Sequence, residues 1–177
     1  MCRLGTVKSG WQRPWIRWVT TLLTLAVMVM IFCFSMQDAA HSDETSGTIS
    51  QAVIRVLYPD YPERTPVEQK EIYDNVQHVV RKCAHFSEYT LLGFLMRLCF
   101  ESWFGAAVRK RGWLPAFSLL AGAVYACTDE LHQILIDGRS GQWTDVLIDS
   151  LGVSLGVLLA GLLVSRIARR AAARPEA

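Results

Sequence analysis

The sequence predicts an all-α membrane protein in which four transmembrane helices form an antiparallel bundle. Apolar residues make up 51% of the 177-residue chain, and they gather in four long stretches. Each stretch is long enough to cross a bilayer as a helix, which takes roughly 20 residues. Basic residues gather beside these stretches, and the connections between the last three are short. We therefore expect a single membrane domain over residues 1–177, with no separate soluble catalytic domain.

The four apolar stretches define the expected transmembrane helices. They cover about residues 15–36, 84–104, 114–136 and 143–164. A signal peptide is the alternative for the first stretch, but its apolar core is longer than the roughly 7–15 residues of a signal sequence, and no clear cleavage motif follows. A retained anchor is therefore favoured. The short connections between the last three helices make their neighbours antiparallel.

The outer loop, residues 38–83, is polar and mostly acidic. Helical spacing of apolar residues predicts a short amphipathic helix in its first half; these residues are Ile49, Val53, Val56 and Leu57. A second helix is predicted after Thr65, because Thr65-Pro66-Val67-Glu68 is typical of a capping box with proline at the first helical position. This second helix can run directly into the second transmembrane stretch. Amphipathic helices beside a membrane commonly lie on its surface.

The distribution of basic residues predicts the orientation of the chain. Three groups, within residues 3–17, 109–111 and 166–174, hold eleven basic residues on one side, against six on the other. By the positive-inside rule, the richer side faces the cytoplasm, so both termini are expected there. We interpret these groups as anchors to anionic lipid rather than as nucleic-acid contacts.

Ionisable residues gather at the outer ends of the predicted helices. An ionised side chain at the bilayer centre costs on the order of 2.5–3.5 kcal/mol. Ionisable residues within a span are therefore expected only where a partner or a function offsets this cost. The second helix begins at the outer side, the third ends there and the fourth begins there, so the antiparallel order brings their polar residues to one level. The candidate site comprises Arg81, His85, Glu88, Asp129, Glu130, Gln133, Arg139, Asp145 and Asp149.

Helical spacing aligns these residues with small ones deeper in the bundle. Asp145, Asp149, Gly152 and Gly156 lie on one face of the fourth helix, and a similar stripe of small residues precedes Asp129 on the third. Small residues allow close helix packing, so we expect tight packing inside and a polar pocket at the outer end. A purely structural polar network is the alternative. Nearer the inner end, Arg97 and Glu101 are interpreted as a snorkelling pair without a chemical role.

The residue types in the candidate site allow several kinds of chemistry. His85 can act as a general base or a metal ligand. The crowded carboxylates must be protonated, paired with a base or bound to a cation. Arg139 has the planar donor group that matches phosphate or carboxylate. No serine or cysteine nucleophile motif is present, and the five cysteines lack metal-site spacing and are interpreted as free thiols. A hydrolase would need an activated water or a metal, and the identity of any metal or cofactor stays open.

The same residues carry a resemblance to the VanZ-like family of bacterial membrane proteins. The resembling segments are residues 34–37, 81–89 with Leu92-Gly93, 129–133, 138–139, 145–146 and 149–152, within about residues 30–160. Many members carry asparagine where this chain has Asp149. The founding member is associated with low-level teicoplanin resistance. The resemblance implies a role in the cell envelope at the bacterial cytoplasmic membrane and supports the chosen site positions, but it implies no reaction.

These observations lead to one leading hypothesis and two alternatives. The leading one is a protein that recognises or modifies an anionic, lipid-linked ligand at the outer leaflet. Arg81 and Arg139 would hold the anionic group, and His85 and Glu88 would perform acid–base chemistry. The remaining carboxylates would orient them or hold a cation. The alternatives are a binding protein that shields a target from an antibiotic, without chemistry, and a small proton- or cation-coupled transporter. The expected partners are membrane lipids and a lipid-linked or glycopeptide ligand, and whether the protein is an enzyme stays open.

Overall fold

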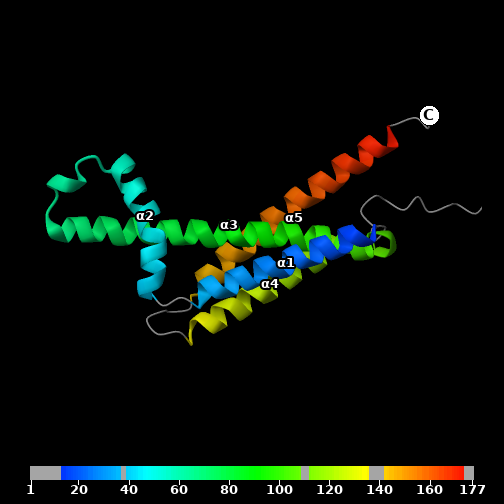
Figure 1. Cartoon of the computed structure of the whole chain (residues 1–177), viewed down its shortest axis with the longest axis horizontal. Coiled ribbons are helices and arrows are strands. Elements are labelled where there is room, and N and C mark those ends of the chain that lie inside the picture. Colours follow the sequence, from blue (N-terminus) through cyan, green and yellow to red (C-terminus); the bar gives the residue numbers. More distant parts are fainter. Residues whose placement is uncertain (1–12, 37–38, 109–111, 136–141, 174–177) are drawn as a thin grey trace, which may run out of the picture.

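The computed structural model describes residues 13–36, 39–108, 112–135 and 142–173, and all of their regular secondary structure is helical. Figure 1 shows the order and arrangement of the helices. They are α1 (Pro14–Ser35), α2 (Ala39–Leu57), the 3-10 helix η2 (Tyr61–Glu63), α3 (Pro66–Val108), α4 (Trp113–Gln133) and α5 (Trp143–Ala172). The predicted all-α class is therefore confirmed for this part of the chain.

The longest helix, α3, joins two segments that the sequence treats separately. It runs for 43 residues and contains both the second outer-loop helix and the apolar stretch that begins near residue 84. No proline or glycine occurs between Val67 and Leu92, so nothing breaks the backbone hydrogen bonds where the composition changes. The predicted boundary at residue 84 is thus a change in side-chain polarity, and the outer helix does run directly into the apolar stretch.

Two other predicted helix ends are wrong by a few residues. The third apolar stretch extends to about residue 136, whereas α4 ends at Gln133. The fourth ends at about residue 164, whereas α5 continues to Ala172. Hydropathy marks where apolar residues stop, but arginine and alanine are good helix formers. The helix therefore continues through Arg166, Arg169 and Arg170.

The capping box predicted at the start of α3 is present. The backbone N–H and the hydroxyl of Thr65 donate hydrogen bonds to the Glu68 carboxylate at 2.9 and 2.8 Å. The Glu68 N–H donates to the Thr65 hydroxyl at 3.4 Å. The Thr65 donors lower the pKa of Glu68 from its ordinary value of 4.5. The stabilisation that this cap provides is therefore complete above about pH 4.5. It is lost as the pH falls through the lowered pKa of Glu68.

Removing the Thr65 hydroxyl is expected to loosen the first turn of α3. In the Thr65→Ala variant, hydrogen exchange over residues 66–70 should become faster because the cap is lost. Thr65→Ser retains the hydroxyl and should exchange like the parent protein. In the parent protein the same protection should fall as the pH is lowered below 4.5. Equal protection in the alanine and serine variants would contradict a role for the cap.

Close backbone contact joins α3 and α5, which cross in Figure 1. A Cβ added to Gly152 would lie 2.6 Å from the Phe86 carbonyl oxygen, and one added to Gly156 would lie 2.6 Å from the Phe94 nitrogen. A Cβ on Gly93 would collide with the backbone of Val153. The predicted close packing through small residues is therefore confirmed for α5, and it places the first turns of α5 beside the middle of α3.

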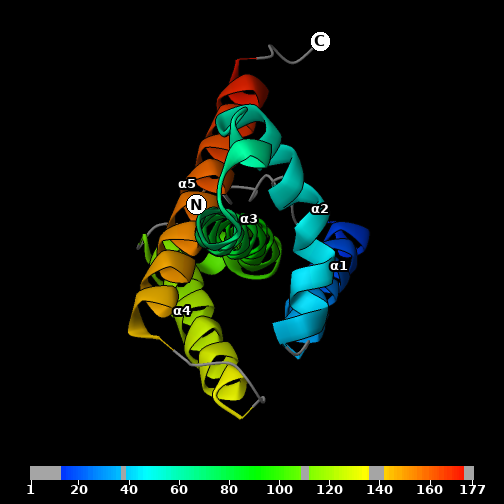
Figure 2. The same cartoon turned by 90° about the vertical axis from the view of Figure 1, so that its left-hand side faces the viewer.

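The predicted amphipathic helix in the outer loop corresponds to the C-terminal part of α2. Figures 1 and 2 show that α2 lies across α3 instead of along it. Ile54 of α2 is buried, and so is Val76 of α3. The predicted apolar face is directed elsewhere, since Ile49, Val56 and Leu57 are exposed. Burial against α3 therefore uses a different side of α2, and the side chains of the predicted apolar face remain exposed.

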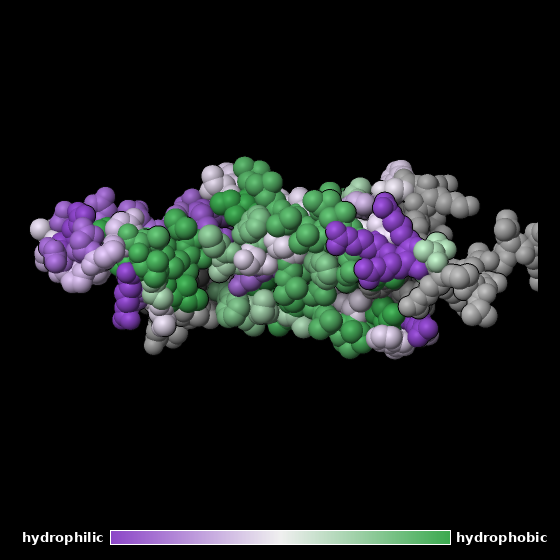
Figure 3. Space-filling view, turned by 90° about the horizontal axis from the view of Figure 1, so that it is seen from above, coloured by the Kyte–Doolittle hydropathy of each residue, from purple (hydrophilic) through white to green (hydrophobic). Residues whose placement is uncertain are grey.

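The surface of the described helices is largely apolar between two polar ends, as Figure 3 shows for one face. Two helices are long and apolar enough to cross a membrane, namely α1 and α5, with mean hydropathies of 2.1 and 2.2. The apolar part of α3 and the end of α4 contain buried charged side chains, which lower their mean hydropathy; examples are Glu101 and Asp129. The described residues therefore indicate membrane character, with two clear candidate spans.

The inner polar pair is buried, so its interpretation as a snorkelling pair is wrong. Arg97 is 7% exposed and Glu101 is fully buried. An Arg97 guanidinium N–H donates to a Glu101 carboxylate oxygen at 2.8 Å, one turn along α3. The Arg97 Nε is buried and has no hydrogen-bond partner in the described part of the chain. This ion pair is therefore a component of the protein core rather than a contact with the membrane surface.

Candidate functional site

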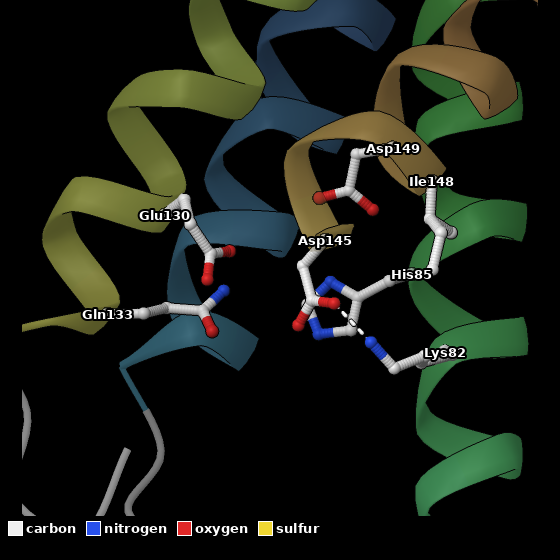
Figure 4. A pocket seen from close by; sticks show the side chains of 7 residues that line it. All are labelled: Lys82, His85, Glu130, Gln133, Asp145, Ile148 and Asp149. Atoms are coloured by element: carbon white, nitrogen blue, oxygen red, sulfur yellow. Dashed lines mark hydrogen bonds and ion pairs between the residues drawn. The ribbon is translucent and has the colours of Figure 1, made fainter. Parts of the chain in front are cut away.

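A polar cavity lies where α4 ends and α5 begins, against the middle of α3. Figure 4 shows the side chains that surround it. They are Lys82, His85, Glu130, Gln133, Asp145, Ile148 and Asp149. The cavity has a volume of about 20 Å³, which is room for about one water molecule. Three helices thus place ionisable groups around a water-sized space.

The contribution of α3 to this cavity comes from Lys82 and His85. They are three residues apart, so they lie on the same side of the helix. The Lys82 ammonium forms an ion pair with the Asp145 carboxylate, drawn as a dashed line in Figure 4. Asp145 is in the first turn of α5, where the helix dipole also favours a negative charge. The Asp145 carboxylate is therefore neutralised at the side of the cavity that faces α3.

Asp149 presents a second carboxylate, one turn further along α5. It lines the cavity and is only 2% exposed. None of the described residues donates a hydrogen bond to it, and the charges nearest to it include Asp129 and Glu130, which are also acidic. A buried carboxylate among other carboxylates is stabilised by a proton, a cation or a hydrogen-bond donor. Asp149 is therefore the group in the cavity with the greatest need for such a partner.

Asp129 is the centre of a buried hydrogen-bond network beside the cavity. It is 3% exposed. Its Oδ2 accepts hydrogen bonds from the Ser35 hydroxyl at 2.9 Å, the Tyr89 hydroxyl at 3.1 Å and the Gln133 amide at 3.3 Å. Its Oδ1 is buried and has no partner among the described residues. Asp129 does not line the cavity itself. It connects α1, α3 and α4, and it holds the side chain of Gln133, which lines the cavity.

Glu130 connects the ends of α4 and α5. Its carboxylate accepts a hydrogen bond from the Gln142 backbone N–H at 2.7 Å. Gln142 is the residue before the first turn of α5, where backbone N–H groups lack helical acceptors. Glu130 therefore fixes the relative position of the two helix ends while it also lines the cavity.

Several predicted site residues lie elsewhere. Arg81 and Glu88 are half-buried on α3 and do not line the cavity, although Glu88 lies close enough to Asp129 for their charges to interact. Arg139 falls outside the described residues. The cavity does include five of the predicted residues. These are His85, Glu130, Gln133, Asp145 and Asp149.

Four residues of the site are absent from the predicted candidate set, although three of them, Ser35, Lys82 and Tyr89, lie in the segments that resemble the VanZ-like family. Lys82 and Ile148 line the cavity, and Ser35 and Tyr89 complete the Asp129 network. The spacing of Lys82 and His85 was a usable signal. Ser35 and Tyr89 carry no charge, so a search for buried ionisable groups overlooks them. Within the described residues, no three His, Cys, Asp or Glu side chains are grouped so that they could hold a metal ion.

Replacing Asp129 with alanine is expected to destabilise the protein by several kcal/mol. Three buried donors would lose this acceptor, and only the Gln133 amide would keep another, the Ser35 hydroxyl at 3.3 Å. Each group left unsatisfied costs about 1–3 kcal/mol. Asp129→Asn should cost much less, because its amide oxygen can take the place of Oδ2. Unfolding in sodium dodecyl sulfate, followed by circular dichroism, measures both changes. Equal losses in the two variants would show that the charge, and not the acceptor oxygen, is what matters.

Comparison with known proteins identifies a family for this chain. The family model described as VanZ/LLP1 matches residues 20–164, a range that contains the whole cavity and the Asp129 network. Neither the curated proteins nor the solved structures provide a significant match. The family match covers most of the chain, and the apolar helices α1 and α5 agree with its membrane character. On this evidence, the chain belongs to the VanZ/LLP1 family.

Proposed function

We propose that this protein is a multi-pass protein of the bacterial cytoplasmic membrane with four membrane-spanning helices. The spans are α1, the part of α3 from about residue 84 onward, α4 and α5, with both termini in the cytoplasm. The exposed apolar surface and the eleven basic residues near the proposed inner side support this arrangement. The polar cavity then lies at the level of the outer leaflet, and the first part of α3 and α2 lie outside the membrane.

In this cavity the protein recognises or modifies an anionic, lipid-linked ligand. The observation that carries the proposal is the convergence of His85, Lys82 and three carboxylates from three helices on one water-sized space. The ligand's anionic group lies at the mouth beside Lys82 and Arg81, since the cavity is too small to enclose it. Where the ligand is modified, His85 accepts a proton from a water in the cavity as the water oxygen bonds to the ligand's phosphorus, while Glu130 and Asp149 orient the base and the water. The ester P–O bond then breaks, the protonated His85 returns the proton to the leaving alcohol oxygen, and phosphate is released.

Within this proposal Asp129 keeps an orienting role, and Glu88 no longer performs acid–base chemistry. Asp129 acts as a positioning residue, because it holds Gln133 instead of lining the cavity. Glu88 modifies the charge near Asp129 without lining the cavity. A link to glycopeptide resistance of the teicoplanin type follows if the ligand is a precursor of the cell wall, in keeping with the association of VanZ proteins with antibiotic resistance.

A functional assay of purified protein in lipid nanodiscs tests the proposal. Polyprenyl phosphate is the probe, with retention measured by native mass spectrometry and release of phosphate measured separately. His85→Ala and Glu130→Ala are expected to abolish phosphate release, and Lys82→Ala is expected to weaken retention. His78→Ala is the matched control, because His78 lies on the same helix but is exposed and outside the cavity.

Each outcome separates the candidate functions. Retention without phosphate release, lost in Lys82→Ala but kept in His85→Ala, would support a binding protein without chemistry. No retention by the parent protein would contradict recognition of this ligand class. Full activity in both His85→Ala and Glu130→Ala, at normal expression, would show that the cavity is not the functional site.

A further inference from the structure

A second groove lies directly beside the polar cavity, between the end of α4 and the start of α5. It has a volume of about 190 Å³. The residues that line it are Cys127, Glu130, Leu131, Ile134, Gln142, Trp143 and Val146. Apart from Glu130 and Gln142, these are apolar or weakly polar side chains. Glu130 lines both spaces, so the polar cavity and the apolar groove meet at one residue.

The contact between Glu130 and Gln142 forms the boundary between the two spaces. The Gln142 N–H donates to the Glu130 carboxylate at 2.7 Å, and both residues line the groove. On the far side of this contact, Leu131, Ile134 and Trp143 are exposed. In a bilayer these side chains face lipid, so the groove is open toward the membrane while the cavity is enclosed by three helices.

We propose that this groove binds the apolar chain of the same lipid-linked ligand whose anionic group lies at the polar cavity. The inference rests on the proposed function. It adds where the apolar chain of the ligand lies and that this chain enters the groove from the membrane. An amphiphile requires an apolar surface directly next to a polar one, and the two spaces that share Glu130 provide that arrangement. Since ligand pockets usually measure about 300–1,000 Å³, a groove of about 190 Å³ accommodates only the part of the chain nearest the head group.

Another groove in the same protein provides a comparison. It has a volume of about 490 Å³ and lies at the opposite end of the bundle, between α3 and α4. Its lining is entirely apolar and comprises Phe100, Phe104, Leu114, Phe117, Leu120, Ala121 and Val124. None of these residues also lines the polar cavity, so this inner groove is suited to bulk lipid chains alone. Contact with a polar site is therefore what distinguishes the groove at Glu130.

Photo-crosslinking with matched variants tests this assignment. The probe is a polyprenyl phosphate that carries a diazirine in its first isoprene unit, added to the full-length protein in nanodiscs. Labelled peptides are identified by mass spectrometry. Leu131→Trp fills the groove at Glu130, and Leu120→Trp fills the inner groove. The two leucines are on the same helix and are 64% and 63% exposed, so the substitutions are equivalent in helix and exposure.

The parent protein is expected to be labelled within residues 127–134 and 142–146, and Leu131→Trp should reduce that labelling at least fivefold. Leu120→Trp should leave it unchanged. Circular dichroism during unfolding must show that both variants are folded; if Leu131→Trp is not, Leu131→Phe takes its place. Retention of the probe with labelling elsewhere, or with equal labelling of the two grooves, would overturn this inference alone. No retention of the probe would overturn the proposed function as well.

Discussion

Replacing Gly156 with alanine is expected to destabilise the protein by roughly 1–3 kcal/mol or more, as overpacking of a tight interior does. The added methyl group would collide with the Thr90 carbonyl oxygen and lie 2.6 Å from the Phe94 nitrogen. Both are backbone atoms of α3, so neither can move without displacing the helix. Unfolding in sodium dodecyl sulfate, followed by circular dichroism, measures the loss.

Gly161 provides the matched control on the same helix. A Cβ added there would meet no atom within 4 Å. Gly161→Ala should therefore leave stability unchanged or raise it by up to about 1 kcal/mol through helix propensity. If both alanine variants behaved alike, the close approach of α3 and α5 would not describe the folded protein.

Removing Glu101 is expected to have a large effect on stability, a loss of about 3–5 kcal/mol in Glu101→Ala. Glu101 is fully buried, and its carboxylate accepts a hydrogen bond from Arg97. In Glu101→Ala, the Arg97 guanidinium would remain buried but would lose the Glu101 carboxylate that neutralises it. The same unfolding measurement, together with the amount of protein in the membrane, reports this loss.

The double variant Arg97→Met with Glu101→Met distinguishes between a charge effect and a packing effect. Replacing a buried ion pair with apolar groups of similar volume is often neutral or stabilising. The double variant should therefore recover most of the stability that Glu101→Ala loses. A double variant as unstable as the single one would show that the polar pair makes an essential contribution beyond neutralising its own charges.

The sequence was sufficient to predict which helix ends meet. The spacing of Asp145 and Asp149 and the order of the apolar stretches place acidic groups at one end of the bundle, and both residues line the cavity. The glycines on the same face of α5 also pack as expected. These features depend on helix periodicity and chain connectivity, which are local or topological properties.

The sequence could not predict which side of α4 faces the cavity. Asp129 and Glu130 are adjacent and both are buried, yet only Glu130 lines the cavity. The difference depends on the rotation of α4 against α1, where Ser35 contacts Asp129. For Arg97 and Glu101, proximity to a helix end suggested contact with water, but packing by other helices buries them. Such details arise from tertiary packing and leave little trace in a single sequence.

The continuity of α3 has a mechanical consequence. Its 43 residues form a rod of about 65 Å at 1.5 Å per residue, and Lys82 and His85 are near its middle. Because the helix is unbroken between the part that packs against α2 and the part that packs against α5, both parts share one axis. On the proposed topology, a load on the part outside the membrane would therefore act on the same rigid element that holds Lys82 and His85.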